Sequence, residues 1–165
     1  MNEVVKFLNE NPVQYLATVG RDGKAKCRPF MFAGEQDGKL WFCTNNQKDV
    51  FKDMQANPEV EISVSSPTYA WIRLNGKVIF ENNMAVKEMC IQNPIVKSQY
   101  GEATNPIFEV FYLEDAHAVS LISPGIRRIS LIPVAKPRFR RQEERTVGRS
   151  KVVRKFLYRN FSLYK

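Results

Sequence analysis

Residues 36–48 read QDGKLWFCTNNQK, and this stretch decides the fold class. Asp37-Gly38 is a strong signal for a tight hairpin turn. Residues 39–44 are rich in aromatic and β-favouring side chains, so they predict a strand. Amide side chains follow at 45–46, and apolar residues then recur at helical spacing over 47–56. The stretch therefore predicts a strand that enters through a hairpin and ends directly at the start of a helix.

The segments on either side continue the pattern of β-rich runs, tight turns and short amphipathic helices. Strands this dense, joined by hairpin turns and broken by short helices, predict an antiparallel β-barrel of the α+β class. The expected elements are helices near residues 4–11, 47–56 and 84–91, and strands at residues 13–19, 25–33, 39–44, 60–64, 70–80, 107–113 and 116–121.

The composition is that of a globular protein. The 165 residues are 44% hydrophobic and 25% charged, which excludes a wholly disordered chain and a fibrous repeat. Residues 1–12 carry acids and amides where a signal peptide would need an apolar run. Cys27, Cys43 and Cys90 form no C-x-x-C motif, and we expect Cys27 and Cys43 to be small buried side chains on strands. A cytoplasmic protein with reduced thiols is predicted.

Charge is divided sharply along the chain. Residues 1–125 hold 12 basic against 15 acidic side chains, a net charge of −3, whereas residues 126–165 hold 13 against 2, a net charge of +11. A shift this sharp is typical of a boundary between a folded domain and a tail. Pro and Gly interrupt the strand pattern at 123–125. We therefore expect a domain at 1–122 and a basic C-terminal extension at 123–165.

The basic extension has several interpretations. From Lys151 onward, apolar residues form an approximate helical stripe among arginines and lysines. Such a helix is typical of a segment that binds nucleic acid, an acidic partner or a membrane surface. The segment also fits a solvated extension without a partner, or an ending produced by a shifted reading frame. The sequence leaves these alternatives open.

Searches for self-sufficient catalytic motifs find none. The chain has no dinucleotide fingerprint, phosphate-binding P-loop, nucleophile elbow or zinc-protease motif. His117, the only histidine, lies in an apolar strand and is expected to be structural. A histidine-based triad or metal site is therefore not expected, and we assign no catalytic side chain and no metal ligand. If the protein is an enzyme, a cofactor carries the difficult step.

Two segments concentrate groups that suit an anionic cofactor. Arg28 offers a planar guanidinium on the second strand, and Pro29 removes a ladder donor, which implies an edge or an interrupted strand. Residues 42–48 carry hydroxyl and amide side chains from a strand end into a helix start, with Lys48 nearby. Each feature has an ordinary alternative, a solvated arginine and a helix cap. Together they predict an anion site on the barrel.

The order and spacing of short segments along residues 1 to about 122 indicate a resemblance to a known family. Residues 1 to about 122 resemble the pyridoxamine 5′-phosphate oxidase-like FMN-binding split-barrel family, nearest to its nitroimidazole-resistance type reductases. The segments that carry the resemblance are Tyr15-Leu16-Ala17-Thr18, Arg28-Pro29-Phe30, Asp37 to Asn45, Lys48 to Met54, Asn57-Pro58-Glu59-Val60-Glu61-Ile62 and Trp71-Ile72-Arg73-Leu74-Asn75-Gly76-Lys77. The histidine that some nitroimidazole-type members carry near the flavin has no counterpart here.

The resemblance implies a homodimer with two FMN molecules at the subunit interface. Arg28 would reach the FMN phosphate or ribityl chain, and Lys48, or its neighbour Asn46, would pair with the phosphate. Trp71 lies on the strand that in relatives approaches the cofactor of the other subunit. The implied cofactor-binding residues are Arg28, Pro29, Phe30, Phe42, Cys43, Thr44, Asn45, Asn46, Lys48 and Trp71.

The function implied by the resemblance is oxidoreduction. Electrons would pass from a reduced nicotinamide through FMN to an unidentified small acceptor, for example a nitro-aromatic or quinone-like compound. The C-terminal substrate residues of a true pyridoxamine phosphate oxidase have no match, so vitamin B6 synthesis is not expected. The alternatives are a flavin-binding protein without turnover, a relative that binds heme or another cofactor, and a nucleic-acid or acidic-surface binder acting through the extension.

Overall fold

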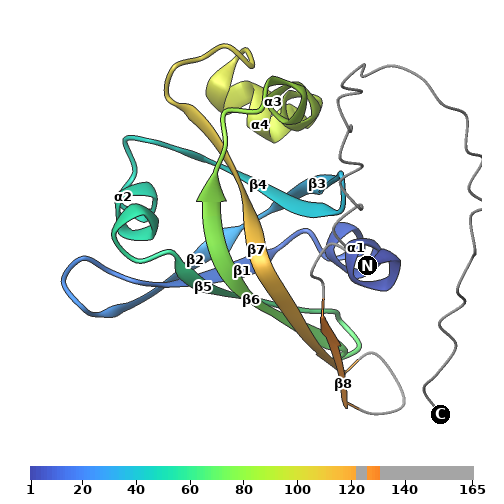
Figure 1. The fold of residues 1–165 in the computed structure, drawn as a ribbon. Helices are drawn as coiled ribbons and strands as arrows, with labels where there is room; N and C mark the ends of the chain where they lie inside the picture. Colours follow the sequence, from blue (N-terminus) through green and yellow to red (C-terminus); the bar gives the residue numbers. More distant parts are fainter. Residues whose placement is uncertain (122–125, 131–165) are drawn as a thin grey trace, which may run out of the picture. The chain divides into compact units, whose positions relative to one another are not determined.

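The computed structural model describes residues 1–121 and 126–130, which form an antiparallel β-sheet with four helices (Figure 1). The expected helical stripe after Lys151 lies outside the described residues. The elements are α1 (Asn2–Glu10), β1 (Gln14–Val19), β2 (Ala25–Phe30), β3 (Phe32–Gln36), β4 (Lys39–Asn45), α2 (Asp49–Ala56), β5 (Glu59–Ser65), β6 (Trp71–Phe80), α3 (Met84–Ile91), α4 (Pro94–Tyr100), β7 (Phe108–Leu121) and β8 (Ile126–Ser130).

The two edge strands of the sheet are connected by the polypeptide chain but are not hydrogen-bonded to each other. The strand order is β2-β1-β5-β6-β7-β4-β3, and β8 also pairs with β7. The two outer strands of this order, β2 and β3, are consecutive in the chain and separated by Met31 alone. A sheet whose edges are joined by one residue but not paired is a split barrel, so the predicted α+β split β-barrel is confirmed.

Local sequence explains the split. Pro29 has no N–H to donate, and β2 is an edge strand that pairs only with β1 and ends at Phe30. The sequence predicted one strand over 25–33, whereas the structure divides this segment at Met31. At the opposite end of β3, Asp37 and Gly38 have positive φ values of 55° and 74°, as a type I′ hairpin turn requires.

Two apolar clusters fill the fold. One lies inside the sheet against α1 and includes Phe42 and Phe111, whose rings stack with centroids 5.5 Å apart. The other lies under α3 and α4, which Figure 1 shows together beyond the end of β6, and includes Trp41 and Phe108. The sequence predicted α3 but not α4. None of the helices within the described ranges has the length and apolar character needed to cross a membrane.

The last strands extend further than expected. β7 is continuous from Phe108 to Leu121, although Asp115 has a positive φ of 50° near the expected break. β8 begins at Ile126 and pairs antiparallel with β7. The sheet therefore includes five residues of the segment assigned to the basic extension.

Candidate functional site

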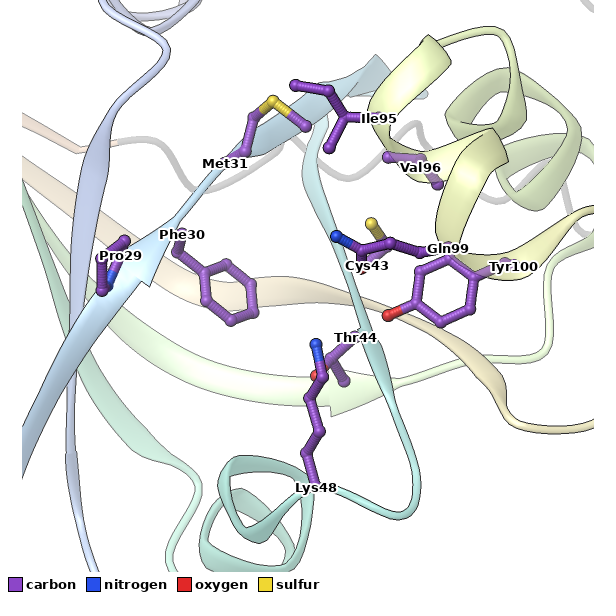
Figure 2. Close-up of a pocket in the computed structure, with 10 residues that line it drawn as sticks. All are labelled: Pro29, Phe30, Met31, Cys43, Thr44, Lys48, Ile95, Val96, Gln99 and Tyr100. Atoms are coloured by element: carbon purple, nitrogen blue, oxygen red, sulfur yellow. The ribbon is translucent and has the colours of Figure 1, made fainter.

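A cavity of about 290 Å³ lies where the barrel splits (Figure 2). β3 pairs with β4 only as far as Phe42, so residues 43–45 pair with β7 alone. The other edge of β4 faces the point where the chain passes from β2 to β3. The residues that line the cavity are Pro29, Phe30, Met31, Cys43, Thr44, Lys48, Ile95, Val96, Gln99 and Tyr100.

The strand side of the cavity holds an aromatic ring and a buried hydroxyl. Phe30 is held by Phe42 and Phe111, with ring centroids 6.5 and 5.9 Å away. Thr44 is only 2% exposed, and its Oγ1 has no hydrogen-bond partner in residues 1–121 and 126–130. A buried polar atom without a partner costs about 1–3 kcal/mol. Thr44 lines the cavity, so this hydroxyl lies in the cavity wall without a partner of its own.

Lys48 supplies positive charge to the same space. It occupies the N-cap position of α2, and Figure 2 shows its side chain extending between Phe30 and Tyr100. The adjacent carboxylate of Asp49 accepts a hydrogen bond from the guanidinium of Arg21 at 2.7 Å. Within the described part of the chain, no carboxylate forms an ion pair with Lys48. An ammonium group and the start of a helix therefore lie at one end of the cavity, a combination that favours anions.

The helical side of the cavity comes from α4, which the sequence analysis missed. Asn93 caps this helix by accepting a hydrogen bond from the Ile95 N–H at 2.9 Å, and Pro94 occupies its first turn. Seven residues give too little periodicity to indicate a helix, but this Asn-Pro pair was the available signal. The helix places Gln99 and Tyr100 against the cavity.

Tyr100 is a hydrogen-bond donor that faces the cavity. Its ring stacks on Phe108 with centroids 4.4 Å apart, and Figure 2 shows its hydroxyl pointing into the space near Lys48. Burial raises the pKa of Tyr100 to about 12, and negative charge on Cys43 adds to the effect. The phenol is therefore protonated at neutral pH and able to donate.

Five of the ten predicted cofactor-binding residues line this cavity: Pro29, Phe30, Cys43, Thr44 and Lys48. They come from β2, β4 and the start of α2, so the fold brings both predicted segments to one place. Arg28 lies on the same face of β2 as Phe30, and its Nη1 donates to Thr18 Oγ1 at 2.9 Å. It adjoins the cavity wall without forming part of it.

The other four predicted residues do not line the cavity. Phe42 is a core side chain stacked on Phe111. The Asn45 side chain accepts from the Gln47 N–H at 2.7 Å, and Asn46 donates to the Pro106 carbonyl and to Glu109. Asn45 thus shapes the turn into α2, and Asn46 ties that turn to the beginning of β7. Trp71, at the opposite end of β6 from Phe80, lies 5.8 Å from the guanidinium carbon of Arg73.

His117 and the acidic side chains form no metal-binding cluster in the described residues. His117 is exposed on β7 and does not line the cavity. Among residues 1–121 and 126–130, no group of three His, Cys, Asp or Glu side chains is placed to hold a metal ion. Cys27 is exposed, contrary to the expectation of a buried thiol, because it points to the outer face of the edge strand β2.

Comparison with known proteins identifies the family. Residues 1–123 match the model of the family described as pyridoxamine 5′-phosphate oxidase. A NimC/NimA family protein from Clostridium acetobutylicum is 32% identical, with a TM-score of 0.71 over 79% of this chain and 91% of that chain. A comparison with curated proteins found no match.

Two further solved structures share the fold. General stress protein 26 from Bacillus anthracis is 19% identical, with a TM-score of 0.65 over 78% of this chain and 97% of that chain. An FMN-binding protein related to pyridoxamine 5′-phosphate oxidase, from Nostoc punctiforme, is 17% identical, with a TM-score of 0.59 over 77% and 87%. The chain therefore belongs to the pyridoxamine 5′-phosphate oxidase family, and its similarity to a NimC/NimA protein confirms the predicted branch.

Proposed function

We propose that the cavity binds FMN and that the protein passes electrons from a reduced nicotinamide to a small acceptor of the nitro-aromatic or quinone-like class. When bound, FMN supplies the two-electron chemistry that the side chains lack. The observation that carries the proposal is the hydroxyl of Thr44, a cavity-lining residue, which is buried and has no hydrogen-bond partner among the described residues. Family membership supports the same assignment.

The residues present fit this cofactor. Lys48 would pair with the phosphate, and Thr44 would hydrogen-bond a polar group of the ligand. Phe30 and Tyr100 carry aromatic faces that exclude water from the cavity, and the Tyr100 phenol can donate a hydrogen bond. Arg28 uses one guanidinium nitrogen on Thr18 and keeps further N–H donors for the phosphate or ribityl chain.

A homodimer would complete the site. The cavity of about 290 Å³ is at the lower end of the usual range for ligand pockets. Tyr15 and Val19 share one exposed face of β1, Val13 is exposed just before the strand begins, and Tyr15 is 48% exposed. Tyr15 pairs with Pro29, which lines the cavity, so this apolar face adjoins the cavity. A second copy on this face would cover it and could bring Trp71 to the partner's cofactor.

The dimer proposal has a direct test. Sedimentation of the full chain should show a dimer, and Tyr15→Glu should shift it toward monomer by placing a charge in the apolar face. Lys24→Glu, an exposed change in the hairpin turn, is the matched control and should leave the dimer intact. A monomeric parent protein would overturn the proposal.

The proposed activity is tested by following bound FMN spectroscopically without oxygen. NADH or NADPH should bleach the flavin band, and a nitro-aromatic or quinone acceptor should restore it over repeated cycles. FMN that binds but is not reduced by either nicotinamide would contradict the enzyme proposal and favour a flavin-binding protein without turnover. We place the protein in the cytoplasm on the same proposal, where both nicotinamides are available.

A further inference from the structure

Two cysteines that are distant in the sequence meet behind the cavity. Cys43 on β4 and Cys90 on α3 both line a second cavity of about 20 Å³, which is too small for more than about one water molecule. Cys90 is 2% exposed, whereas Cys43 also lines the main cavity and is half-buried. One thiol of the pair is therefore reachable from the main cavity and the other is enclosed beside it.

The two thiols have opposite electrostatic environments. Interaction with the Cys90 thiol lowers the pKa of Cys43, and the Lys48 ammonium lowers it further. The same interaction and burial raise the pKa of Cys90. Cys43 also lines the main cavity whereas Cys90 is enclosed, so a small oxidant reaches Cys43 first, and its thiolate would be the nucleophile.

We propose that Cys43 and Cys90 are a peroxide-reactive pair, with Cys43 as the attacking thiol and Cys90 as the resolving thiol. The Cys43 thiolate attacks one peroxide oxygen, the O–O bond breaks, and Cys43 becomes a sulfenic acid while hydroxide leaves and takes up a proton as water. The Cys90 sulfur then attacks the Cys43 sulfur, and the hydroxyl leaves with the Cys90 proton as a second water. Two thiols are oxidised to one disulfide, and hydrogen peroxide is reduced to water.

The new bond would change the main cavity. It would tie β4 to α3, and it would move the Cys43 side chain, which forms part of the cavity wall. Oxidation therefore gives the cavity a second state that does not depend on the ligand bound there. The chemistry needs no cofactor, so it stands or fails independently of the proposed FMN site.

Cys27 is the internal control for this proposal. It lies exposed on β2 opposite Ala17 of β1 and lines neither cavity. Cys27 shares the outer face of Tyr15 that the proposed dimer would cover, so the comparison is also made in the Tyr15→Glu variant, where Cys27 is the most accessible thiol and an indiscriminate oxidant would modify it first. Selective oxidation of the pair would instead reflect its local chemistry.

The test treats the full chain, freed of flavin, with hydrogen peroxide, blocks the remaining thiols with iodoacetamide and identifies the peptides by mass. We expect a peptide pair joined through Cys43 and Cys90, lighter by two hydrogens, with Cys27 alkylated. In Cys90→Ser, Cys43 should stop as a sulfenic acid that dimedone traps. In Cys43→Ser, Cys90 should stay reduced, and Cys27→Ser should leave the linked pair unchanged.

Two results would overturn the proposal. One is complete alkylation of Cys43 and Cys90 after a peroxide treatment that oxidises Cys27. The other is dimedone trapping on Cys90 rather than on Cys43 in the single-serine variants. As a second readout, the rate of Cys43 alkylation without peroxide should level off at a pH below the usual thiol pKa, and Lys48→Gln should move that point upward.

Discussion

The two sides of the main cavity are built from different kinds of segment. The strand side is formed by β2, β4 and Lys48, the N-cap residue of α2. It carries the buried hydroxyl of Thr44 and the positive charge of Lys48. The helical side uses α4 and carries Gln99 and Tyr100. The strand side resembles an anion site, whereas the helical side closes the cavity with uncharged side chains. We therefore expect cofactor affinity to reside in the strand side, and stability and acceptor choice in the helical side.

The largest effect on stability should come from removing the aromatic ring of Tyr100 on the helical side. Tyr100→Ala deletes the ring that stacks on Phe108, so the free energy of unfolding should fall by about 3–5 kcal/mol. Tyr100→Phe keeps the ring and should stay within about 1 kcal/mol of the parent. Urea unfolding of the flavin-free protein measures both. Equal losses in the two variants would show that the hydroxyl, not the ring, stabilises this side.

The next effect concerns the charge on the strand side. Lys48→Gln removes the ammonium group, and FMN affinity should fall roughly 10- to 100-fold because a charge-assisted hydrogen bond contributes about 1.5–3 kcal/mol. Lys52→Gln, an exposed change on α2, is the matched control and should leave affinity unchanged. Titration with FMN at two salt concentrations checks this. Equal losses in both variants would assign the effect to overall charge.

Removing the buried Thr44 hydroxyl should have two smaller effects, a gain in stability without FMN and a loss of FMN affinity. Thr44→Val keeps the shape and removes Oγ1, so the flavin-free protein should gain about 1 kcal/mol of stability. FMN affinity should fall roughly fivefold, since about 1 kcal/mol of hydrogen bonding is lost on binding. Unfolding and FMN titration on the same sample measure the two changes. A variant that loses stability without FMN would show that Oγ1 has a partner inside the protein.

The smallest effect should be at the exposed end of the helical side. Ile95 is 60% exposed, so Ile95→Ser should change stability by no more than about 0.5 kcal/mol and leave FMN affinity unaltered. The Michaelis constant for the acceptor should change, because Ile95 lines the cavity on the side away from Lys48. Kinetics with two acceptors of different size test this, and an unchanged constant for both would remove Ile95 from the acceptor site.

The same contrast explains what the sequence could predict. Asp37-Gly38 and Pro29 act through local backbone geometry, so the hairpin and the edge strand were predictable. The resemblance named residues on β2 and β4 that the fold brings together. By contrast, Ile95 and Tyr100 reach the cavity only because α4 packs on Phe108 through the second core cluster. That packing depends on tertiary contacts that no local pattern encodes.

The pairing of β3 with β4 explains why Phe42, a predicted site residue, does not line the cavity. Phe42 and Thr44 share a face of β4, but only Thr44 lies beyond the last β3 pair, so Phe42 is covered and Thr44 faces the cavity. Neighbouring residues of one motif can therefore separate into core and site. Trp71 stands apart for another reason, because its proposed role requires a partner subunit.

Titration of the purified, flavin-free protein with FMN, followed by absorbance and run beside Thr44→Val, tests the central claim most directly. We expect saturation at one FMN per chain, with Thr44→Val binding more weakly although it is at least as stable as the parent. Absence of FMN binding by the folded parent protein, or equal binding by both proteins, would contradict the assignment of this cavity and its buried hydroxyl to the cofactor.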